Sequence, residues 1–425
     1  MSLYLKNVAK MFILTLPNVY FDFAKAFDSV NHDIILSKLK YKFSVDGRLL
    51  KFIADYLKDR QQCVIIGNGM SSSKCAKSGV PQGSILGPLL FVLFINDLPD
   101  GLSPGTQLSM YADDTKIWRP IHTENDCCLL QIDIDYLYDW SIRNKMRFHP
   151  DKCKVLTVTD RSPPLLSVLP FTTFVYSLGD SSLEYVVAER DLGVIVTSNL
   201  NWDEQCQKVL SKANQQLGLT RRTCNIVQDQ ARRRVLYLAL VRSQFEHCSI
   251  IWRPQNKSFM DRLEGLQKRA VKWILGEEYT SYSEQMYVQK CRQLNFLPLS
   301  ARFDFLDLLF FYKVVRGLVP VEIPPYLSPY VDNRRLRNCH LDHLCYTCSI
   351  TPRSDSGAFA RSFFYRTHLM WNRIPVSIRE GTKLNVFKIE LCKYLWTQID
   401  RCDHPDDDDD DGQGSGSRES RMVVT

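Results

Sequence analysis

The sequence predicts an α+β fold, in which an antiparallel sheet packed on helices is followed by a mostly helical region. Apolar and polar residues alternate in residues 18–23 and again in residues 108–118, which predicts half-buried strands. Two adjacent aspartates, Asp113 and Asp114, interrupt the second run where a tight turn would reverse the chain. After residue 200 the apolar residues take helical spacing. With 425 residues, 45% of them hydrophobic, more than one domain is expected.

The first predicted strand, residues 18–23, carries a carboxylate on an otherwise apolar segment. Alternation places Phe21 and Phe23 on one face and Tyr20 and Asp22 on the other. A buried carboxylate is costly unless it has a partner, so Asp22 is a candidate functional residue. Helices are predicted next at residues 33–41 and 49–57, and a strand at residues 61–66.

A glycine-rich loop, residues 79–84, precedes an apolar run at residues 89–98. Glycines on both sides of Pro81 and Gln82 allow the backbone to approach a ligand closely, and the apolar run predicts a buried helix. On its own, such a loop is most often only a turn.

The tip of the predicted hairpin carries Asp113 and Asp114. Like charges held side by side repel unless a cation is shared between them, and a hard divalent ion such as Mg²⁺ suits carboxylate oxygens. Asp-Asp pairs are also common in polar turns without any ligand. The pair alone therefore leaves a metal site and a plain turn both open.

The rest of the first half continues the mixed pattern. Residues 126–146 predict an amphipathic helix whose inward residues are Leu129, Ile132, Leu137 and Trp140. Residues 148–158 predict a loop leading into a strand, and residues 191–196 predict another strand.

Three helices are predicted after residue 200, and their outer faces are basic. The first starts at Asn201 or Trp202, the second covers residues 228–245, and the third covers residues 259–275 and ends at Gly276. A basic helical face indicates either nucleic-acid contact or only a solvated surface. The basic residues are Lys208, Lys212, Arg221, Arg222, Arg232, Arg233, Arg234, Arg242, Lys268, Arg269 and Lys272.

Overall charge and cysteine usage narrow the class of protein. The net charge is +7, although six aspartates at 406–411 contribute to it. The remainder is basic enough for a polyanion partner, and equally compatible with a mildly basic globular surface. Fourteen cysteines without a secretory signal indicate a reducing, intracellular compartment, cytoplasm or nucleus, rather than secretion. No apolar stretch is long enough to span a membrane, so no membrane contact is expected.

A cluster of cysteine and histidine residues between Cys339 and Cys348 leaves zinc binding open, although its spacing fits no tetrahedral pattern well. Residues 401–425 are acidic and rich in Gly and Ser, which predicts disorder.

Four segments taken in order resemble the motifs of a reverse transcriptase, in wording close to non-LTR (LINE-type) retrotransposons of the Jockey and chicken-repeat kind. They are Phe21-Asp22-Phe23-Ala24-Lys25-Ala26-Phe27-Asp28, Gly79-Val80-Pro81-Gln82-Gly83-Ser84, Tyr111-Ala112-Asp113-Asp114 and Pro150-Asp151-Lys152. Residues 269–276 and 371–375 resemble the region that follows the polymerase in such elements. The resemblance covers residues 18–395.

The resemblance implies the right-hand polymerase fold and its four regions. Residues 1–197 would be the palm, 198–280 the basic helical thumb, 281–400 a helical region after the polymerase, and 401–425 a tail. Only about twenty residues precede Asp22, where the family has a fingers subdomain, so an N-terminally truncated copy is expected.

The resemblance also implies a reaction, RNA-directed DNA synthesis on a primer 3′-hydroxyl. Two Mg²⁺ ions, with Mn²⁺ as an alternative, would be held by Asp22, Asp113 and Asp114, with the carbonyl of Phe23 as a further ligand. Lys152 would be a general acid. The incoming nucleotide would contact Phe23, Ala26, Phe27, Gln82, Gly83 and Tyr111, with Phe27 excluding a ribose 2′-hydroxyl.

The partners implied are an RNA template, a DNA primer or RNA–DNA hybrid, and dNTPs; no protein partner is indicated. Arg221, Arg222, Arg232, Arg233, Arg234, Lys268 and Arg269 would contact the nucleic-acid backbone. Two alternatives stay open. One is a catalytically inactive remnant that retains at most nucleic-acid binding. The other is an RNA-dependent RNA polymerase. Phe27 argues against this alternative, and so does the alanine at position 112, where such enzymes usually have glycine.

Overall fold

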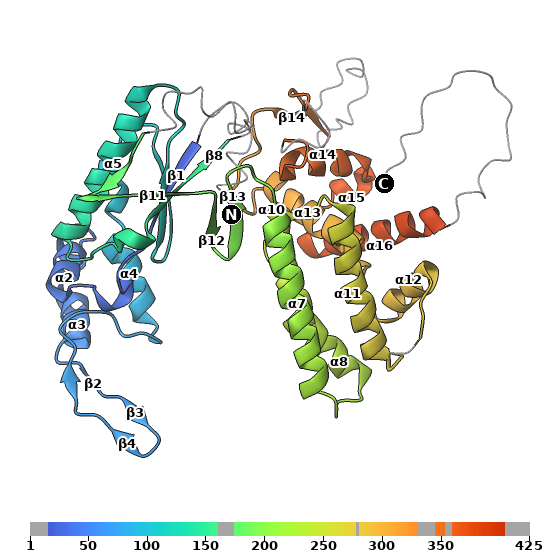
Figure 1. The fold of residues 1–425 in the computed structure, drawn as a ribbon, viewed down its shortest axis with the longest axis horizontal. Helices are drawn as coiled ribbons and strands as arrows, with labels where there is room; N and C mark the ends of the chain where they lie inside the picture. Colours follow the sequence, from blue (N-terminus) through green and yellow to red (C-terminus); the bar gives the residue numbers. More distant parts are fainter. Residues whose placement is uncertain (1–15, 160–173, 278–279, 330–344, 353–358, 404–425) are drawn as a thin grey trace.

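The computed structural model describes residues 16–159, 174–277, 280–329, 345–352 and 359–403 (Figure 1). A sheet covered by helices forms one part of the molecule, and an assembly of helices forms the other. The α+β fold predicted from the sequence is confirmed.

A five-stranded sheet forms the centre of the first part. Its strand order is β11-β8-β1-β7-β6. The central strand β1 pairs antiparallel with β7 and β8, β6 pairs antiparallel with β7, and β11 pairs parallel with β8. The predicted antiparallel sheet is thus present, with one parallel strand added at its edge. The bounds are β1 Leu16–Phe21, β6 Gln107–Tyr111, β7 Asp114–Trp118, β8 Lys154–Val158 and β11 Glu184–Val186.

Four helices bury one face of this sheet. Side-chain caps fix where three of them begin: Asn31 for α2, Asp46 for α3 and Thr123, in a capping box, for α5. The helices are α2 His32–Tyr41, α3 Gly47–Leu57, α4 Leu86–Ile95 and α5 Glu124–Arg143. Between them and the sheet lies the largest apolar core of this part.

The inward face of α5 differs from the one predicted. Ile132 is 56% exposed and Leu129 is half-buried, whereas Leu130, Ile134 and Leu137 are buried. The buried stripe runs at spacings of three and four residues through these positions and includes an aspartate, Asp133. Of the four predicted inward residues, Leu137 and Trp140 are buried as predicted, whereas Leu129 and Ile132 are not. Hydrophobic periodicity did not predict the inward position of the Asp133 carboxylate. The predicted buried helix at residues 89–98 is similarly shifted, because α4 begins at Leu86 and leaves Leu89 and Val92 exposed.

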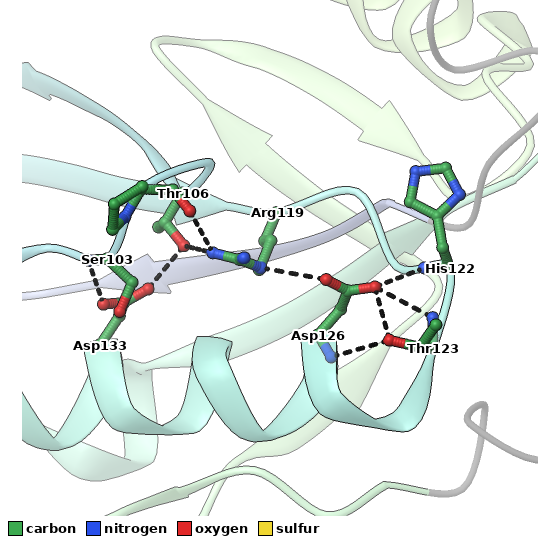
Figure 2. A network of polar contacts seen from close by, with 8 residues as sticks. Ser103, Thr106, Arg119, His122, Thr123, Asp126 and Asp133 are labelled. Atoms are coloured by element: carbon green, nitrogen blue, oxygen red, sulfur yellow. Dashed lines mark hydrogen bonds and ion pairs between the residues drawn. The ribbon is translucent and has the colours of Figure 1, made fainter.

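A buried polar network fastens the β6–β7 hairpin to α5 (Figure 2). Asp133 accepts hydrogen bonds from the Ser103 backbone N–H (2.7 Å) and from the Thr106 hydroxyl (2.5 Å). Arg119, which follows β7, donates to the Thr106 hydroxyl (3.0 Å) and lies 3.5 Å from the Asp126 carboxylate in α5. These partners explain why a carboxylate is tolerated in the core.

The segment predicted as a strand at residues 61–66 is instead an arm of two short ribbons, in which β2 pairs with β5 and β3 with β4. The strand is interrupted at Cys63 and Val64, and the apolar side chains of the arm are exposed. The bounds are β2 Gln61–Gln62, β3 Ile65–Ile66, β4 Gly69–Met70 and β5 Lys74–Cys75.

A separate hairpin, β12 (Ala188–Asp191) and β13 (Val194–Thr197), packs against the sheet through a small core. The segment predicted as one strand at 191–196 contains its turn, where Leu192 and Gly193 both have positive φ. Val196 contributes to the core shared with the sheet, whereas Val194 belongs to a core of the helical part. A further small ribbon is formed by β9 Ser177–Leu178 and β10 Ser181–Ser182.

The helical part begins with α7 (Asp203–Thr223), whose predicted inner residues Cys206, Val209, Ala213 and Leu217 are buried. The helix predicted at 228–245 is three consecutive segments with a π-helical middle. The third predicted helix is confirmed as α11 and ends at Gly276, whose φ is 75°. The bounds are α8 Gln230–Leu236, η4 Tyr237–Arg242, α9 Ser243–Glu246, α10 Ser249–Trp252 and α11 Lys257–Leu275.

The remaining helices share cores with the ones before them. Helix α13 contributes Leu299 and Phe303 to the core around α7 and α11, and Phe311 to the C-terminal core, so the expected boundary at residue 280 stays a prediction. Asp307 of α13 is buried and binds Arg253 and Arg366. The bounds are α12 Glu284–Gln293, α13 Leu299–Val315, β14 Leu327–Pro329, β15 Tyr346–Cys348, α14 Phe363–Arg373, α15 Val376–Arg379 and α16 Leu384–Asp403.

Two predictions concern sites that the structure covers incompletely. Of the Cys/His cluster, Cys339, His340 and His343 lie outside the described residues, and the Cys345 thiol accepts a hydrogen bond from Arg379 (2.7 Å). Within the described ranges, every helix is too short or too polar to cross a bilayer.

Candidate active site

Two of the predicted acidic residues lie at the ends of neighbouring strands. In the β1–β7 pair, Phe21 is opposite Thr115. One step further along this antiparallel register, Asp22 comes opposite Asp114. Two residues more than ninety positions apart in the sequence are therefore neighbours because the strands that carry them pair.

The turn between β6 and β7 brings Asp113 next to them. Tyr111 pairs with Asp114, so Ala112 and Asp113 form a two-residue turn. Ala112 has φ 52°, in the left-handed region, where a residue other than glycine costs about 1 kcal/mol. Tyr111 is 69% exposed at the edge of the sheet.

A cavity of about 620 Å³ opens on the face of the sheet away from α2–α5. Its walls come from four strands, from the loop before β8 and from the turn of the β12–β13 hairpin. The charged residues that line it are Asp22, Asp114, Lys116, Asp151, Lys152, Lys154, Glu189, Arg190 and Asp191. Acidic and basic side chains thus surround one hollow at the ends of β1 and β7.

Negative charge is concentrated at Asp114. Burial raises the pKa of its carboxyl, and the neighbouring Asp113, Asp191 and Asp22 carboxylates raise this pKa further, while Arg190 acts in the opposite direction. Charge repulsion of this kind is relieved when a cation binds among the carboxylates.

Lys152 provides a positive charge beside Asp22. Its Nζ lies 3.2 Å from the Asp22 carboxylate, and both side chains are partly exposed. The short helix η3 (Pro150–Lys152) that carries it is held by the backbone, because the His149 N–H donates to the Asp22 carbonyl (2.8 Å). Phe148 stacks on Phe23 with ring centroids 4.4 Å apart.

A buried ion pair joins β7 to the β12–β13 hairpin. Lys116, two residues after Asp114, pairs with Asp191, and both side chains are about nine-tenths buried. Sequence reasoning missed this pair. A lysine within an apolar strand was the available signal, since such a residue needs a partner.

The residues of the glycine-rich loop and of the segment after β1, which were predicted to contact the nucleotide, lie together but do not line this cavity. The glycine-rich loop packs on the segment after β1: Val80 N–H donates to the Phe27 carbonyl (2.9 Å), and Gln82 Nε2 donates to the Asp28 carboxylate (3.0 Å). Gly79, with φ 92°, lies so close to Asp28 that a Cβ would meet its Cα at 2.9 Å. Phe27 stacks on Phe91 of α4 (4.4 Å), Ala26 is buried, and Gly83 faces open space.

Some of the basic residues predicted on the outer helical faces are buried or bonded to other groups of the protein, and others are exposed. Arg233 is buried and donates to the carbonyls of Val227 (2.5 Å) and Trp273 (2.7 Å), so its predicted place on the outer face was wrong. Arg242 is also buried, and Arg234 donates to the carbonyls of Leu294 and Asn295. Lys268 pairs with Glu284 and Arg269 donates to Asn214, whereas Arg222 and Arg232 are exposed.

The donor set suits a hard divalent cation. In the part of the chain that the structure describes, no three Asp, Glu, His or Cys side chains are close enough together to ligate one ion. The Asp22 and Asp114 carboxylates nevertheless share a cavity, and burial together with the charges of Asp113 and Asp22 raises the pKa of Asp114. Carboxylate oxygens are the ligands that Mg²⁺ and Mn²⁺ take.

Comparison with known families gives a match for the sheet part and for most of α7. Residues 17–217 match the family described as "Reverse transcriptase (RNA-dependent DNA polymerase)". This range contains the carboxylates, the cavity and the glycine-rich loop.

Similar curated proteins come from mobile elements. A probable RNA-directed DNA polymerase from transposon BS of Drosophila melanogaster is 28% identical over 274 residues, which are 60% of this chain and 28% of that protein. The RNA-directed DNA polymerase from mobile element jockey of Drosophila funebris is 30% identical over 194 residues, 43% of this chain and 20% of that protein. The chain thus spans less than a third of the length of these relatives.

Among solved structures, telomerase from Candida tropicalis in complex with a fragment of telomeric RNA is similar at a TM-score of 0.34. The sequence identity is 11%, over 69% of this chain and 48% of that one.

Proposed function

Because residues 17–217 make this chain a member of the reverse transcriptases of LINE-type, non-LTR retrotransposons, we propose that it is an RNA-directed DNA polymerase. In this proposal it extends a primer 3′-hydroxyl with dNTPs along an RNA template. The observation that carries the proposal is the shared cavity of Asp22 and Asp114 beside the Asp113 turn.

The proposed roles follow from the chemistry of phosphoryl transfer. Members of the family use divalent metal ions, and we propose Asp22, Asp113 and Asp114 as the residues that hold Mg²⁺ here, with the Phe23 carbonyl as a further ligand. Two such ions, when bound, lower the pKa of the attacking hydroxyl and balance charge on the leaving pyrophosphate. Lys152 would release its contact with Asp22 and donate a proton to the pyrophosphate.

The nucleotide would lie between the carboxylates and the glycine-rich loop. Tyr111 is exposed beside Asp114 and is proposed to contact the primer end or the new base pair. Phe27, fixed against Phe91, would exclude a ribose 2′-hydroxyl, and Gln82 and Gly83 would line the base pair. Ala26 is buried, and its role is to support Phe27 rather than to touch the nucleotide.

The template–primer would be held by the exposed part of the basic helices. Arg221 and Arg222 line a cavity at the end of α7, and Arg232 is exposed on α8. Phosphate contacts by such side chains position the duplex without reading its sequence. Arg233 and Arg234 are left out of this proposal because their guanidinium groups bind backbone carbonyls.

Primer extension on an RNA template tests the proposal. The purified chain with Mg²⁺ is expected to extend a DNA primer with dNTPs, and Asp113→Asn is expected to reduce the rate about a thousandfold, because several kcal/mol of transition-state stabilisation depend on the ions. Asp135→Asn, which changes an exposed carboxylate on α5, is the matched control and should leave the rate unchanged.

The outcomes separate the three readings. Product that does not depend on Asp113 would contradict the proposed site. An inactive chain that still binds RNA–DNA hybrid would support the catalytically inactive remnant. Efficient incorporation of ribonucleotides by the unaltered chain would contradict the proposed role of Phe27 and favour an RNA polymerase.

A further inference from the structure

The β12–β13 hairpin borders the cavity with β12 and its turn, whereas Val194 and Val196 anchor β13 in two apolar cores. Among the described strands it forms a two-stranded sheet of its own, without ladder hydrogen bonds to the five-stranded sheet. A backbone hydrogen bond from Ser198 to the Val187 carbonyl closes the base of the hairpin, and a second, from Thr159 just after β8 to the Ser198 carbonyl, joins this base to the end of β8. Its turn, Leu192 and Gly193, lies at the other end, where the cavity is.

The Lys116–Asp191 ion pair joins the turn end to the sheet, and on the other side the Leu192 carbonyl lies 3.4 Å from His247 Nε2. Both partners of the ion pair are about nine-tenths buried, and the Lys116 ammonium also lies 5.7 Å from the centre of the Tyr20 ring. A buried charge without its partner is strongly unfavourable, so the pair can hold the turn in one position.

The same pair also places one positive and one negative side chain beside the Asp114 carboxylate. Lys116 is two residues after Asp114 on β7, and the two side chains share the cavity with Asp191. Neighbouring Arg190 also lines the cavity. Any displacement of the turn would therefore change which charges face Asp114.

We propose that Lys116 and Asp191 are a positioning pair, which fixes the β12–β13 turn as one wall of the active site and keeps the charge around Asp114 suited to a divalent ion. The inference rests on the proposed function. Neither residue is proposed to touch the substrate.

Two single substitutions have opposite electrostatic consequences. Lys116→Met removes one positive charge near Asp114, which makes the surroundings of the carboxylates more negative and should tighten binding of Mn²⁺ about fivefold. Asp191→Asn removes one negative charge near Asp114 and should weaken Mn²⁺ binding by a similar factor. Both should loosen the hairpin, so amide hydrogen exchange in residues 190–197 should become at least about tenfold faster.

The experiment uses the full chain and measures Mn²⁺ affinity by electron paramagnetic resonance and exchange by mass spectrometry. Lys116→Arg keeps the charge and should restore slow exchange. Lys154→Met is the matched control: Lys154 pairs with Glu184 on the same face, and its loss should leave exchange in the hairpin unchanged. In single-turnover primer extension, Lys116→Met should lower the maximal rate despite its tighter metal binding, and Lys116→Arg should recover most of it.

Unchanged exchange in both single variants, or shifts of Mn²⁺ affinity in the same direction, would overturn the positioning role. These readouts do not need polymerase activity. A chain that binds Mn²⁺ with the expected opposite shifts but extends no primer would support the pair and contradict the proposed function. If Mn²⁺ does not bind at all, the proposed function fails and the exchange data alone decide the role of the pair.

Discussion

At the scale of single residues, Asp114 is a partly buried carboxylate with three other carboxylates near it. Burial, followed by the charges of Asp113, Asp191 and Asp22, raises the pKa of its carboxyl. In the folded chain without a bound cation, the ionised form is therefore disfavoured relative to the unfolded chain. Ionisation of Asp114 consequently opposes folding at neutral pH.

Asp114→Asn is expected to stabilise the metal-free chain. Below the unfolded pKa of about 3.9, both proteins are neutral at this position and should have equal stability. As pH rises through the folded pKa, the wild-type chain should lose stability relative to the variant, and the difference should then stay constant. Since the side chain is partly exposed, we expect a melting temperature only about 1–2 °C higher at pH 7.5.

Thermal melts between pH 3.5 and 8 measure this difference. Added Mg²⁺ should reverse the order, because it stabilises the wild-type chain more than the variant. A variant that melts below wild type without metal at pH 7.5 would contradict the predicted repulsion.

The sequence identified candidate site residues that belong to a recognisable motif. It did not identify residues whose bonding partner lies in a distant segment of the chain. Asp22, Asp113 and Asp114 could be singled out because carboxylates interrupt apolar strands. Lys116 and Arg233 could not be assigned, because their partners Asp191 and Trp273 become neighbours only through tertiary packing. Arg233 was predicted on an outer helical face and is buried, whereas no position was predicted for Lys116, which is buried as well.

At the scale of elements, apolar periodicity predicts which segments form helices, and capping residues and buried polar groups determine the ends of the helices and the inward face of α5. Hydrophobic periodicity predicted the presence of α5, α7 and α11, and caps such as Thr123 and Gly276 explain their ends. It failed at Asp133, since a carboxylate can occupy an inward position only when hydrogen bonds satisfy it, and their donors lie thirty residues upstream. In the arm at residues 61–75, by contrast, the short strands pair with each other and bury no face, so their apolar residues did not indicate a core.

Asp133→Ala tests the network that fastens the hairpin to α5. Its loss leaves the Ser103 N–H and the Thr106 hydroxyl without their acceptor, and we expect a decrease in the free energy of unfolding of about 3 kcal/mol. Asp135→Ala, two residues further on an exposed position of the same helix, should change it by less than about 0.5 kcal/mol. Urea denaturation of both variants gives the comparison, and equal effects would contradict the role of the network.

Arg233→Met and Arg232→Ala separate structure from nucleic-acid binding on α8. Arg233→Met removes donors from two backbone carbonyls and from the Gln228 side chain, and should lower the free energy of unfolding by about 2–4 kcal/mol. Arg232→Ala should leave stability unchanged but weaken binding to RNA–DNA hybrid.

The salt dependence of that binding is the decisive measurement. Removing one phosphate contact should lower the slope of log affinity against log salt by about one. If Arg232→Ala leaves the slope unchanged while Arg222→Ala lowers it, Arg232 does not lie on the binding face.

At the scale of the whole molecule, the two parts differ in how completely they cover their apolar residues. Exposed apolar side chains gather in the sheet part, on the arm and on α4. Ile66 is 79% exposed and Ile85 is 95% exposed. Exposed apolar surface of this kind promotes association of chains. The sheet part is therefore expected to limit solubility.

Replacing three arm residues tests this expectation. Ile65→Lys, Ile66→Thr and Met70→Lys together should decrease self-association, measured by light scattering at increasing concentration, without lowering the melting temperature, because these side chains contact little of the fold. A matched triple substitution at buried positions 53, 57 and 90 should unfold the chain. If the arm variant melts as low as that control, the arm belongs to the core in solution.

The left-handed backbone at Ala112 bears on how such hairpins are compared between polymerases. A glycine there would fit the turn with less strain than the alanine that this chain has. The presence of glycine or alanine next to the paired acids thus reflects torsional preference at one bend. Ala112 therefore argues less strongly against an RNA polymerase, and the proposed role of Phe27 is what remains against that alternative.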